Sequence, residues 1–291
     1  MTDFSPVVVG IGEILWDMLP SGKRAGGAPI NFVYHAAKMG AEGYAISAIG
    51  NDVLGREIIR ELKKNHITHI ITTNNYPTGR VEVELKNGIP SYKIIEGVAW
   101  DHIRVTPQAI DVMRRADAIC FGTLALRNAG SRDSIKKLLS FARPRAIKFF
   151  DINLRGNYYS LSLIDELLQL ATVFKINDDE IKIIRELFGI NGSDDEVCRE
   201  FIRRYNLDYL IFTAGEKYSV VYTKDDKSYL ATPKVEVCDT VGAGDAFSGA
   251  FTYNILAGKS LREAHAEAVK ISAYVCTKAG AWPEYNLLPK G

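Results

Sequence analysis

The stretch "CDTVGAGDAFSGAF" (residues 238–251) places a run of small residues and an aspartate immediately before an apolar segment. Phe247, Phe251 and Ile255 follow one another at a spacing of four residues, with alanines beside them. This periodicity predicts a helix from about 244 to 257 whose apolar side is turned inward.

The start of this helix is suited to binding a phosphate. Gly242, Ala243 and Gly244 lie there, and unpaired backbone N–H groups together with the helix dipole favour an anion at such an end. Asp245 lies in the same turn and can accept a proton from a hydroxyl group that attacks phosphorus. Alternatively, the helix dipole alone favours Asp245 and the glycines only turn the chain. The stretch by itself leaves both interpretations open.

Composition limits the class of protein. The chain has 291 residues, 47% of them hydrophobic, which is enough for one large α/β domain with an appendage or two modest domains. Its 36 basic and 35 acidic residues give a net charge of +1 without long blocks of either sign. We therefore expect a small-molecule partner, and neither nucleic acid nor a membrane surface.

Cysteine usage and the N-terminus indicate the compartment. The four cysteines are far apart in sequence and form neither a CxxC pair nor a Cys/His cluster, so no zinc site or disulfide framework is expected. The N-terminus has no basic leader before its short apolar run, and no apolar stretch approaches the roughly 20 residues that span a bilayer. We expect a cytoplasmic protein.

Short apolar runs separated by helix-like segments recur along the chain. This alternation is typical of a doubly wound α/β fold, in which helices flank a mainly parallel sheet. Asp52, Thr106 before Pro107, and Asn177 with Glu180 have the positions of helix N-caps. The predicted buried strands are 7–11, 44–49, 118–121, 146–151, 173–176 and 209–213.

Two segments break the alternation. Residues 13–22 place Glu13, Leu15 and Asp17 on one side of a strand, and residues 79–96 predict a hairpin that turns at Asn87-Gly88. No helix separates these strands, so we expect a small β-sheet that forms a lid over the core. Residues 1–291 are expected to form one domain that contains this lid.

Several motifs resemble those of the PfkB, or ribokinase-like, carbohydrate kinases, from residue 7 to about 283. The family pattern D-T-x-G-A-G-D is matched at every fixed position from Asp239 to Asp245. Residues 26–32, "GGAPINF", are similar to the family's G-G-A-x-x-N run, and Glu13 and Asp17 match its E-x-x-x-D element. The resemblance implies a ribokinase-like fold with Asp245 as catalytic base.

The sugar-side residues combine this resemblance with simple chemistry. A carboxylate accepts hydrogen bonds from neighbouring hydroxyls, and an asparagine amide both donates and accepts, which suits Asp17 and Asn31 for a sugar. Gly27 lets a ring approach the backbone. "DINLR", ending at Arg155, resembles the D-x-N-x-R run of fructokinases and of keto-deoxy-sugar-acid kinases. Tyr158-Tyr159 departs from the fructokinase form, which weakens the choice of fructose.

The resemblance also implies nucleotide and metal contacts. Asn177 and Glu180 match the family's N-x-x-E element, in which Glu180 would order magnesium-bound waters; the same spacing fits a helix capping box. Thr213 and Gly215 resemble the nucleotide-contacting T-x-G turn, although Tyr218 replaces its second glycine. The remaining implied contacts are Ala279 and Gly280 for the adenine pocket and Asp239 for a monovalent cation.

The predicted function is therefore ATP- and Mg²⁺-dependent phosphorylation of a primary sugar hydroxyl, with fructose as first candidate and fructose 6-phosphate as its product. 2-Keto-3-deoxygluconate, ribose and a nucleoside are alternative acceptors, and potassium activation stays open. A basic pocket of Lys23, Arg24 and Arg80 would instead suit a sugar phosphate. A catalytically silent sugar- or nucleotide-binding protein is the alternative of another class.

Subunit pairing is a further expectation. Exposed apolar residues on the lid, such as Val81, Val83 and Ile94, would pair two subunits, and the resemblance implies a homodimer formed through the lid.

Overall fold

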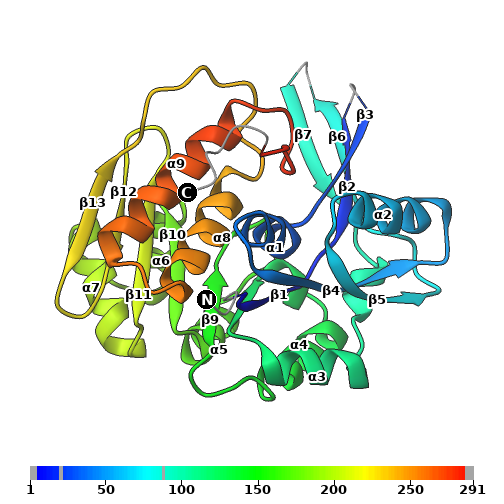
Figure 1. The fold of residues 1–291 in the computed structure, drawn as a ribbon, viewed down its shortest axis with the longest axis horizontal. Helices are drawn as coiled ribbons and strands as arrows, with labels where there is room; N and C mark the ends of the chain where they lie inside the picture. The colour runs from blue at the N-terminus through cyan, green and yellow to red at the C-terminus, as the bar shows by residue number, and fades with distance from the viewer. Residues whose placement is uncertain (1–4, 20–21, 87–88, 286–291) are drawn as a thin grey trace.

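The computed structural model describes residues 5–19, 22–86 and 89–285, and for residues 83–86 and 89–92 it describes the backbone alone. The described chain forms a large sheet flanked by helices and a smaller sheet beside it (Figure 1). The predicted turn at Asn87-Gly88 lies outside the described residues.

The larger sheet has nine strands and is mainly parallel. Only the pairs β11–β12 and β12–β13, at one edge, are antiparallel. In spatial order the strands are β13 (Lys227–Ala231), β12 (Tyr218–Tyr222), β11 (Tyr209–Ala214), β10 (Val173–Asn177), β9 (Ile147–Asp151), β8 (Ala118–Gly122), β1 (Val7–Ile11), β4 (Glu42–Gly50) and β5 (Thr68–Asn74).

Both faces of this sheet are covered, so its strands are apolar on both sides. Val7, Val9 and Ile11 of β1 pack into one core, and Val8 packs into the other. The helices beside the first core are α3 (Pro107–Arg115), α4 (Ala129–Leu139), α5 (Leu161–Leu170), α6 (Glu180–Phe188) and α7 (Asp194–Tyr205). Those beside the second are α1 (Ala28–Lys38), α2 (Val53–Lys64), α8 (Ala243–Leu256) and α9 (Leu261–Cys276).

The predicted caps Asp52 and Thr106 are confirmed by their capping bonds, whereas the N-cap of α6 is Asp179 and Asn177 lies two residues before it. Asp52 accepts a hydrogen bond from the Gly55 N–H at 2.7 Å, and Thr106 accepts one from Ala109 at 3.1 Å. Asn177 and Glu180 form reciprocal bonds, each side chain accepting from the other residue's backbone N–H. These bonds satisfy N–H groups that a helix start leaves without intrahelical partners.

The smaller sheet is the predicted lid, and it rises beside one end of the larger sheet in Figure 1. Its order is β3 (Gly22–Gly26), β2 (Leu15–Leu19), β6 (Arg80–Lys86) and β7 (Ile89–Ile94). Short 3-10 helices, Ala99–His102 and Leu124–Leu126, lie near its base. The first lid segment was predicted as one strand through residue 22, whereas the chain turns back and adds β3.

The structure differs from the predictions at three further places. Strand β5, which carries His69, was not predicted. The hairpin β12–β13 was not predicted. Val81 is only 7% exposed because it faces the cavity described below, so it is not an exposed pairing residue; the side chain of Val83 lies outside the described residues.

Among the described residues, no helix is both long enough and apolar enough to cross a lipid bilayer.

Candidate active site

A cavity of about 450 Å³ lies at the carboxyl ends of the central strands, between them and the lid. Ligands in open α/β sheets bind at this edge. It is lined by lid residues Leu15, Asp17, Val81 and Ile94, by strand-end and loop residues Glu13, Leu124, Asp151, Asn153, Arg155, Lys175, Asn177 and Thr213, by Gly27, Ala28 and Asn31 at the start of α1, and by Thr240, Val241, Gly242, Gly244 and Asp245 at the start of α8.

Two helices bring Asp245 and Asn31 together. α1 and α8 pack so closely that a Cβ added to Gly249 would lie 2.6 Å from the Phe32 carbonyl oxygen. Asn31 donates from Nδ2 to Asp245 Oδ2 at 2.7 Å. Burial, and next the nearby Asp151, raise the pKa of Asp245 to about 6, while Lys175, Asn31 and Arg155 act in the opposite direction. A carboxyl group with this pKa is ionised at neutral pH and can accept a proton.

Lys175 supplies a buried positive charge beside Asp245. It lies in β10 and donates to Asp151 Oδ2 at 2.7 Å, and both side chains are at most 10% exposed. Burial by itself would lower the pKa of Lys175, but the Asp151 carboxylate raises it above its ordinary value. A Cβ added to Gly244 would lie 3.2 Å from Lys175 Nζ. The ammonium group therefore faces the N-terminus of α8.

The helix start itself is built by small residues. Gly242 caps α8 with a φ of 79°, and a Cβ there would lie 2.6 Å from the Ala281 Cβ. Gly242 and Gly244 line the cavity, as expected of an anion-binding turn. The Ala243 N–H instead donates to the Thr240 carbonyl oxygen at 3.2 Å, and Ala243 does not line the cavity.

The predicted sugar-side residues Asp17, Gly27, Asn31 and Arg155 all line the cavity. Asp17 and Leu15 face the cavity from β2, while Trp16 points the other way and donates to the Leu54 carbonyl oxygen at 3.0 Å. Burial raises the pKa of Asp17, and Arg155 partly offsets this effect.

Glu13 adds a second buried acid to this side. Its side chain is nearly inaccessible, and its Oε1 accepts from the Ala28 N–H at 3.2 Å. Burial raises the pKa of Glu13 to about 7, and the charge of Asp245 contributes in the same direction. Near neutral pH Glu13 is therefore partly protonated, and the site carries fewer negative charges than its acids suggest.

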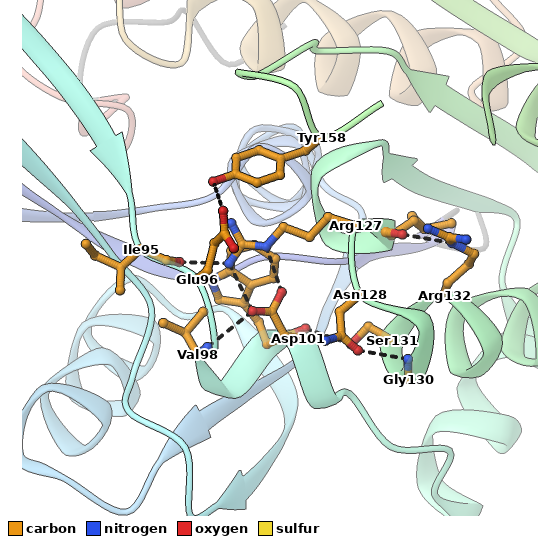
Figure 2. Close-up of polar contacts among 12 residues, drawn as sticks. Ile95, Glu96, Val98, Asp101, Arg127, Asn128, Gly130, Ser131, Arg132 and Tyr158 are labelled. Atoms are coloured by element: carbon orange, nitrogen blue, oxygen red, sulfur yellow. Dashed lines mark hydrogen bonds and ion pairs between the residues drawn. The ribbon is translucent and has the colours of Figure 1, made fainter. Parts of the chain in front are cut away.

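The loop that carries Arg155 is tied to the base of the lid. Figure 2 shows Arg127 between Asp101 and the end of β7: its Nε and Nη2 donate to the Asp101 carboxylate at 2.8 and 3.0 Å, and Nη2 also donates to the Ile95 carbonyl oxygen. The Arg127 guanidinium lies 4.0 Å from the Trp100 ring centroid and 4.9 Å from that of Tyr158.

Tyr158 completes this connection. Its hydroxyl donates to Glu96 at 2.7 Å, and its backbone N–H donates to the Arg155 carbonyl oxygen at 3.1 Å (Figure 2 shows the former). The tyrosine that departs from the fructokinase motif therefore holds the Arg155 loop against the lid.

Of the predicted nucleotide residues, Asn177 and Thr213 line the cavity, whereas Gly215, Ala279 and Gly280 do not. The Gly215 carbonyl oxygen accepts from the Thr232 hydroxyl at 3.0 Å. Thr213 lies beside Asn177, because β10 and β11 pair in parallel with these two residues in register. The cavity thus extends from the lid to the ends of β10 and β11.

Glu180 and Asp239 were the predicted metal residues. Glu180 is buried and accepts backbone hydrogen bonds from Leu154 at 2.9 Å and Asn177 at 3.0 Å, so its carboxylate orients two loops and does not line the cavity. No group of three or more His, Cys, Asp or Glu side chains among the described residues is arranged to hold a metal ion.

Asp239 already has a positive partner. Its Oδ2 accepts from Arg24 Nη1 at 2.6 Å and from the Gly280 N–H at 3.1 Å, and its Oδ1 accepts from the Val241 N–H at 3.0 Å. Although burial opposes the effect, these donors lower the pKa of Asp239. A potassium ion at the same carboxylate would lie beside a guanidinium, so this arrangement does not fit the predicted cation site.

Sequence reasoning assigned no site role to Lys175, Asp151 or Glu13. The lysine had a signal, because a charged residue within the apolar run "VFKIN" is seldom buried without a partner. Asp151 and Glu13 were noted only as parts of motifs. The contribution of Trp282, treated below, had no local signal, since it reaches Asn31 from the other end of the sequence.

Comparison with known proteins supports the fold and identifies the family of the chain. An uncharacterized sugar kinase of Pyrococcus horikoshii is 26% identical, over 95% of this chain and 92% of that protein. Its structure in complex with ATP matches with a TM-score of 0.81 at 25% identity, covering 95% of this chain and 94% of that one. The predicted ribokinase-like fold is thereby confirmed.

Other relatives carry different substrate names. "Probable fructokinase-5" of Arabidopsis thaliana is 27% identical over 96% of this chain and 94% of its own length. "5-Dehydro-2-deoxygluconokinase 2" of Bacillus cereus is 25% identical over 88% of this chain and 82% of its own. The pfkB family carbohydrate kinases match residues 19–285. The chain that builds this cavity therefore belongs to the pfkB family of carbohydrate kinases.

Proposed function

We propose that this protein transfers the terminal phosphoryl group of ATP to a primary hydroxyl of a small sugar, with fructose as the first candidate acceptor. The observation that carries the proposal is the position of Asp245, buried in the cavity between the predicted sugar residues and the start of α8. A base and an anion-binding turn thus lie within one helical turn of each other.

In the proposed reaction the sugar hydroxyl donates its hydrogen bond to Asp245 as its oxygen attacks phosphorus. The proton passes to Asp245, the bond between the phosphoryl group and ADP breaks, and the sugar phosphate forms. The N–H groups at Gly244 and Asp245 have no intrahelical partners because of their position, so they are available to the transferring group. Lys175, facing the same helix end, adds a fixed positive charge.

Magnesium is proposed to arrive with ATP as part of the substrate. Mg²⁺ usually keeps several waters and binds through substrate phosphates and one or two carboxylates, so a preformed protein cage is not needed. The lid carries Asp17 on β2, and together with Gly27, Asn31 and Arg155 this residue is proposed to hold the sugar. Asn177 and Thr213 are proposed to contact the nucleotide, and for Gly215, Ala279 and Gly280 this role stays a prediction.

A keto-deoxy sugar acid is the second candidate acceptor, and Arg155 is the reason. Lys175 is engaged by Asp151, whereas Arg155 donates to the carbonyl oxygen of Leu154 and faces the cavity. Its guanidinium could pair with a substrate carboxylate. An Arg155→Lys variant should lose at least tenfold in kcat/KM for an acidic acceptor and less for fructose.

The basic residues that would favour a sugar phosphate are paired elsewhere. Lys23 is bound to Glu57, Arg24 to Asp239 and Arg80 to Glu82, and none of the three basic side chains lines the cavity. A phosphate group on the acceptor would need a positively charged partner. If one of these three basic residues bound it, the existing ion pair of that residue would break. We therefore rank sugar phosphates below neutral and acidic sugars.

The test is a coupled assay of ADP release with Mg-ATP against fructose, 2-keto-3-deoxygluconate, ribose, adenosine, inosine and fructose 1-phosphate, with and without potassium. Selective turnover of one acceptor would support the kinase and identify its substrate class. If ATP bound but no acceptor reacted, a silent binding protein would gain support. An unchanged rate without potassium is expected, because Arg24 occupies Asp239.

Two coarser expectations accompany this proposal. A cytoplasmic location agrees with the four free cysteines. A homodimer through the lid is also proposed, with the partly exposed Ile94, and not the buried Val81, as the apolar contact residue. Light scattering of the purified protein measures the mass directly and would refute the dimer if it gave 32.3 kDa.

A further inference from the structure

The amide of Asn31 is held at both of its ends. Its Nδ2 donates to Asp245 Oδ2 at 2.7 Å, and its Oδ1 accepts from Trp282 Nε1 at 2.8 Å. The Asn31 side chain is buried, at 5% exposure. These contacts form a short chain of hydrogen bonds from the indole to the proposed base.

The indole decides which way the amide points. A tryptophan N–H can donate but cannot accept, so it requires the carbonyl end of the Asn31 amide. The NH₂ end must then face Asp245, which as a carboxylate can only accept. If the amide turned over, its oxygen would face the carboxylate and its NH₂ group would face the indole N–H. Both contacts would be repulsive.

Trp282 is itself held by an aromatic cluster. The segment 281–285, which we call the C-terminal strap, lies against α1 and α9. The Trp282 ring stacks on Tyr34 with centroids 5.9 Å apart, and the Tyr34 hydroxyl donates to the Pro283 carbonyl oxygen at 2.6 Å. Tyr274 donates in the same way to the Glu284 carbonyl oxygen at 2.6 Å. Through Ala281 the strap also touches Gly242 at the start of α8.

We infer that Trp282 is a positioning residue, which acts through Asn31 to orient the Asp245 carboxylate and to stabilise its charged form. This inference rests on the proposed function of Asp245 as a base. The Asn31 NH₂ group is the donor to the Asp245 carboxylate, so a change in the orientation of the amide changes how well the charged form is stabilised.

The other charges around Asp245 come from different elements and do not depend on Trp282. Burial and Asp151 raise the pKa of Asp245, and Lys175 and Arg155 lower it together with the Asn31 hydrogen bond. Glu13 and Cys120 lie near enough for their own pKa values to respond to Asp245. Loss of the Asn31 bond should therefore raise the pKa of Asp245 above its value of about 6.

The test variant is Trp282→Phe, which keeps an aromatic ring beside Tyr34 and removes only the N–H donor. The acidic limb of the kcat/KM profile should move up by about one pH unit. Turnover below pH 6 should then fall about tenfold, whereas the value at pH 9 should stay near that of the unchanged protein.

Tyr34→Phe is the matched control. It removes another hydrogen bond to the same strap and leaves the Trp282 N–H in place. If Trp282 only fixed the strap, the two variants would lose activity alike at every pH. We expect the acidic limb of the kcat/KM profile to shift in Trp282→Phe and to stay in place in Tyr34→Phe. If this limb stayed in place in both variants, the inference would be overturned.

A second measurement does not require turnover. A ¹³C NMR titration of the aspartate carboxyl carbons, with Asp245→Asn to assign the signal, follows the protonation of Asp245 directly. Trp282→Phe should raise that midpoint by about one unit, and an unchanged midpoint would refute the inference. Because the titration needs no acceptor, it gives this answer even if the protein proves to be no kinase.

Discussion

Two buried ionic clusters, one at the base of the lid and one in the cavity, differ in charge balance. At the lid base, Arg127 is paired with Asp101, and their side chains are 6% and 2% exposed. In the cavity, Lys175 is paired with Asp151 at nearly the same distance, but Asp245 and Glu13 are buried beside them and form no salt bridge with a described residue. The first cluster is balanced, and the second has an excess of acid.

This difference separates a structural role from a chemical one. The Arg127 guanidinium satisfies a carboxylate, a carbonyl oxygen and two aromatic rings, so it joins the lid to the core. The excess acid of the cavity raises the pKa values of Asp245 and Glu13, so their ionised forms destabilise the folded state. Such shifts are typical of sites that transfer protons or bind charged ligands.

Removing the base from the unbalanced cluster should have the largest effect. Asp245→Asn keeps the shape of the side chain and a partner for Asn31 but cannot take up the proton. We expect kcat to fall by about 10³- to 10⁴-fold, since this is the range of general-base catalysis. ATP affinity, measured by calorimetry, should change little. Retention of near-native turnover would show that another group is the base.

Breaking the balanced cluster should instead cost stability. Arg127→Met leaves the Asp101 charge buried without its partner, so the free energy of unfolding should fall by about 3–5 kcal/mol. The double variant Arg127→Met with Asp101→Leu removes both charges and should recover much of that loss. Urea unfolding measures both values. Equal losses in the single and double variants would mean that packing, and not the charge pair, holds the lid base.

The contribution of the cavity cluster to folding stability should fall as pH rises. An ordinary ion pair shows the opposite dependence, because its carboxylate stabilises the folded state once it is ionised. The folded pKa of Asp245, about 6, exceeds its ordinary value of 3.8, so the folded state binds the proton more tightly. Its contribution to stability is present below pH 4 and is lost as pH rises to about 6. Asp245→Asn should therefore be more stable than the unchanged protein at pH 8, by about 2 kcal/mol, and equally stable near pH 4.

The control for this comparison is Asp111→Asn, whose side chain is 73% exposed and should change stability little at either pH. Urea unfolding at the two pH values measures all three proteins. A destabilised Asp245→Asn at pH 8 would mean that the carboxylate stabilises the folded state after all.

The smallest effect is expected at the partly exposed pair of Arg24 and Asp239, which lies outside both clusters. The two side chains are 37% and 20% exposed, so solvent screens their attraction. Arg24→Gln should lower the free energy of unfolding by less than about 1 kcal/mol. The same variant would leave the Asp239 carboxylate free to bind a potassium ion. Potassium activation that appeared only in the variant would support the conclusion that Arg24 takes the place of the cation.

Local patterns in the sequence predicted most of what lies within one element. The parallel strands, the caps at Asp52 and Thr106, and the turn around Gly242 follow from periodicity and helix-end chemistry. The hairpin β12–β13 and strand β5 were missed because their polar and tyrosine-rich sequences lack a continuous apolar run.

Contacts between distant segments could not be predicted in this way. Lys175 and Gly244 meet only because β10 ends opposite the start of α8. The sequence suggested that Arg24 was one of three basic residues that could bind a sugar phosphate. In the structure, the pairing of β2 with β3 places Arg24 against Asp239 instead. Val81 appeared to be a surface residue because alternation along a strand does not tell which face a second layer covers.

The hydrogen bond between Trp282 and Asn31 joins residues 251 positions apart. Contacts of such long sequence separation form late when a chain folds, because much of the chain must be ordered before the two ends meet. A folding intermediate with both sheets assembled but the strap undocked would leave the Asn31 amide free to turn over. During synthesis, which proceeds from the N-terminus, the helix that carries Asn31 must wait for nearly the whole chain before its amide is fixed.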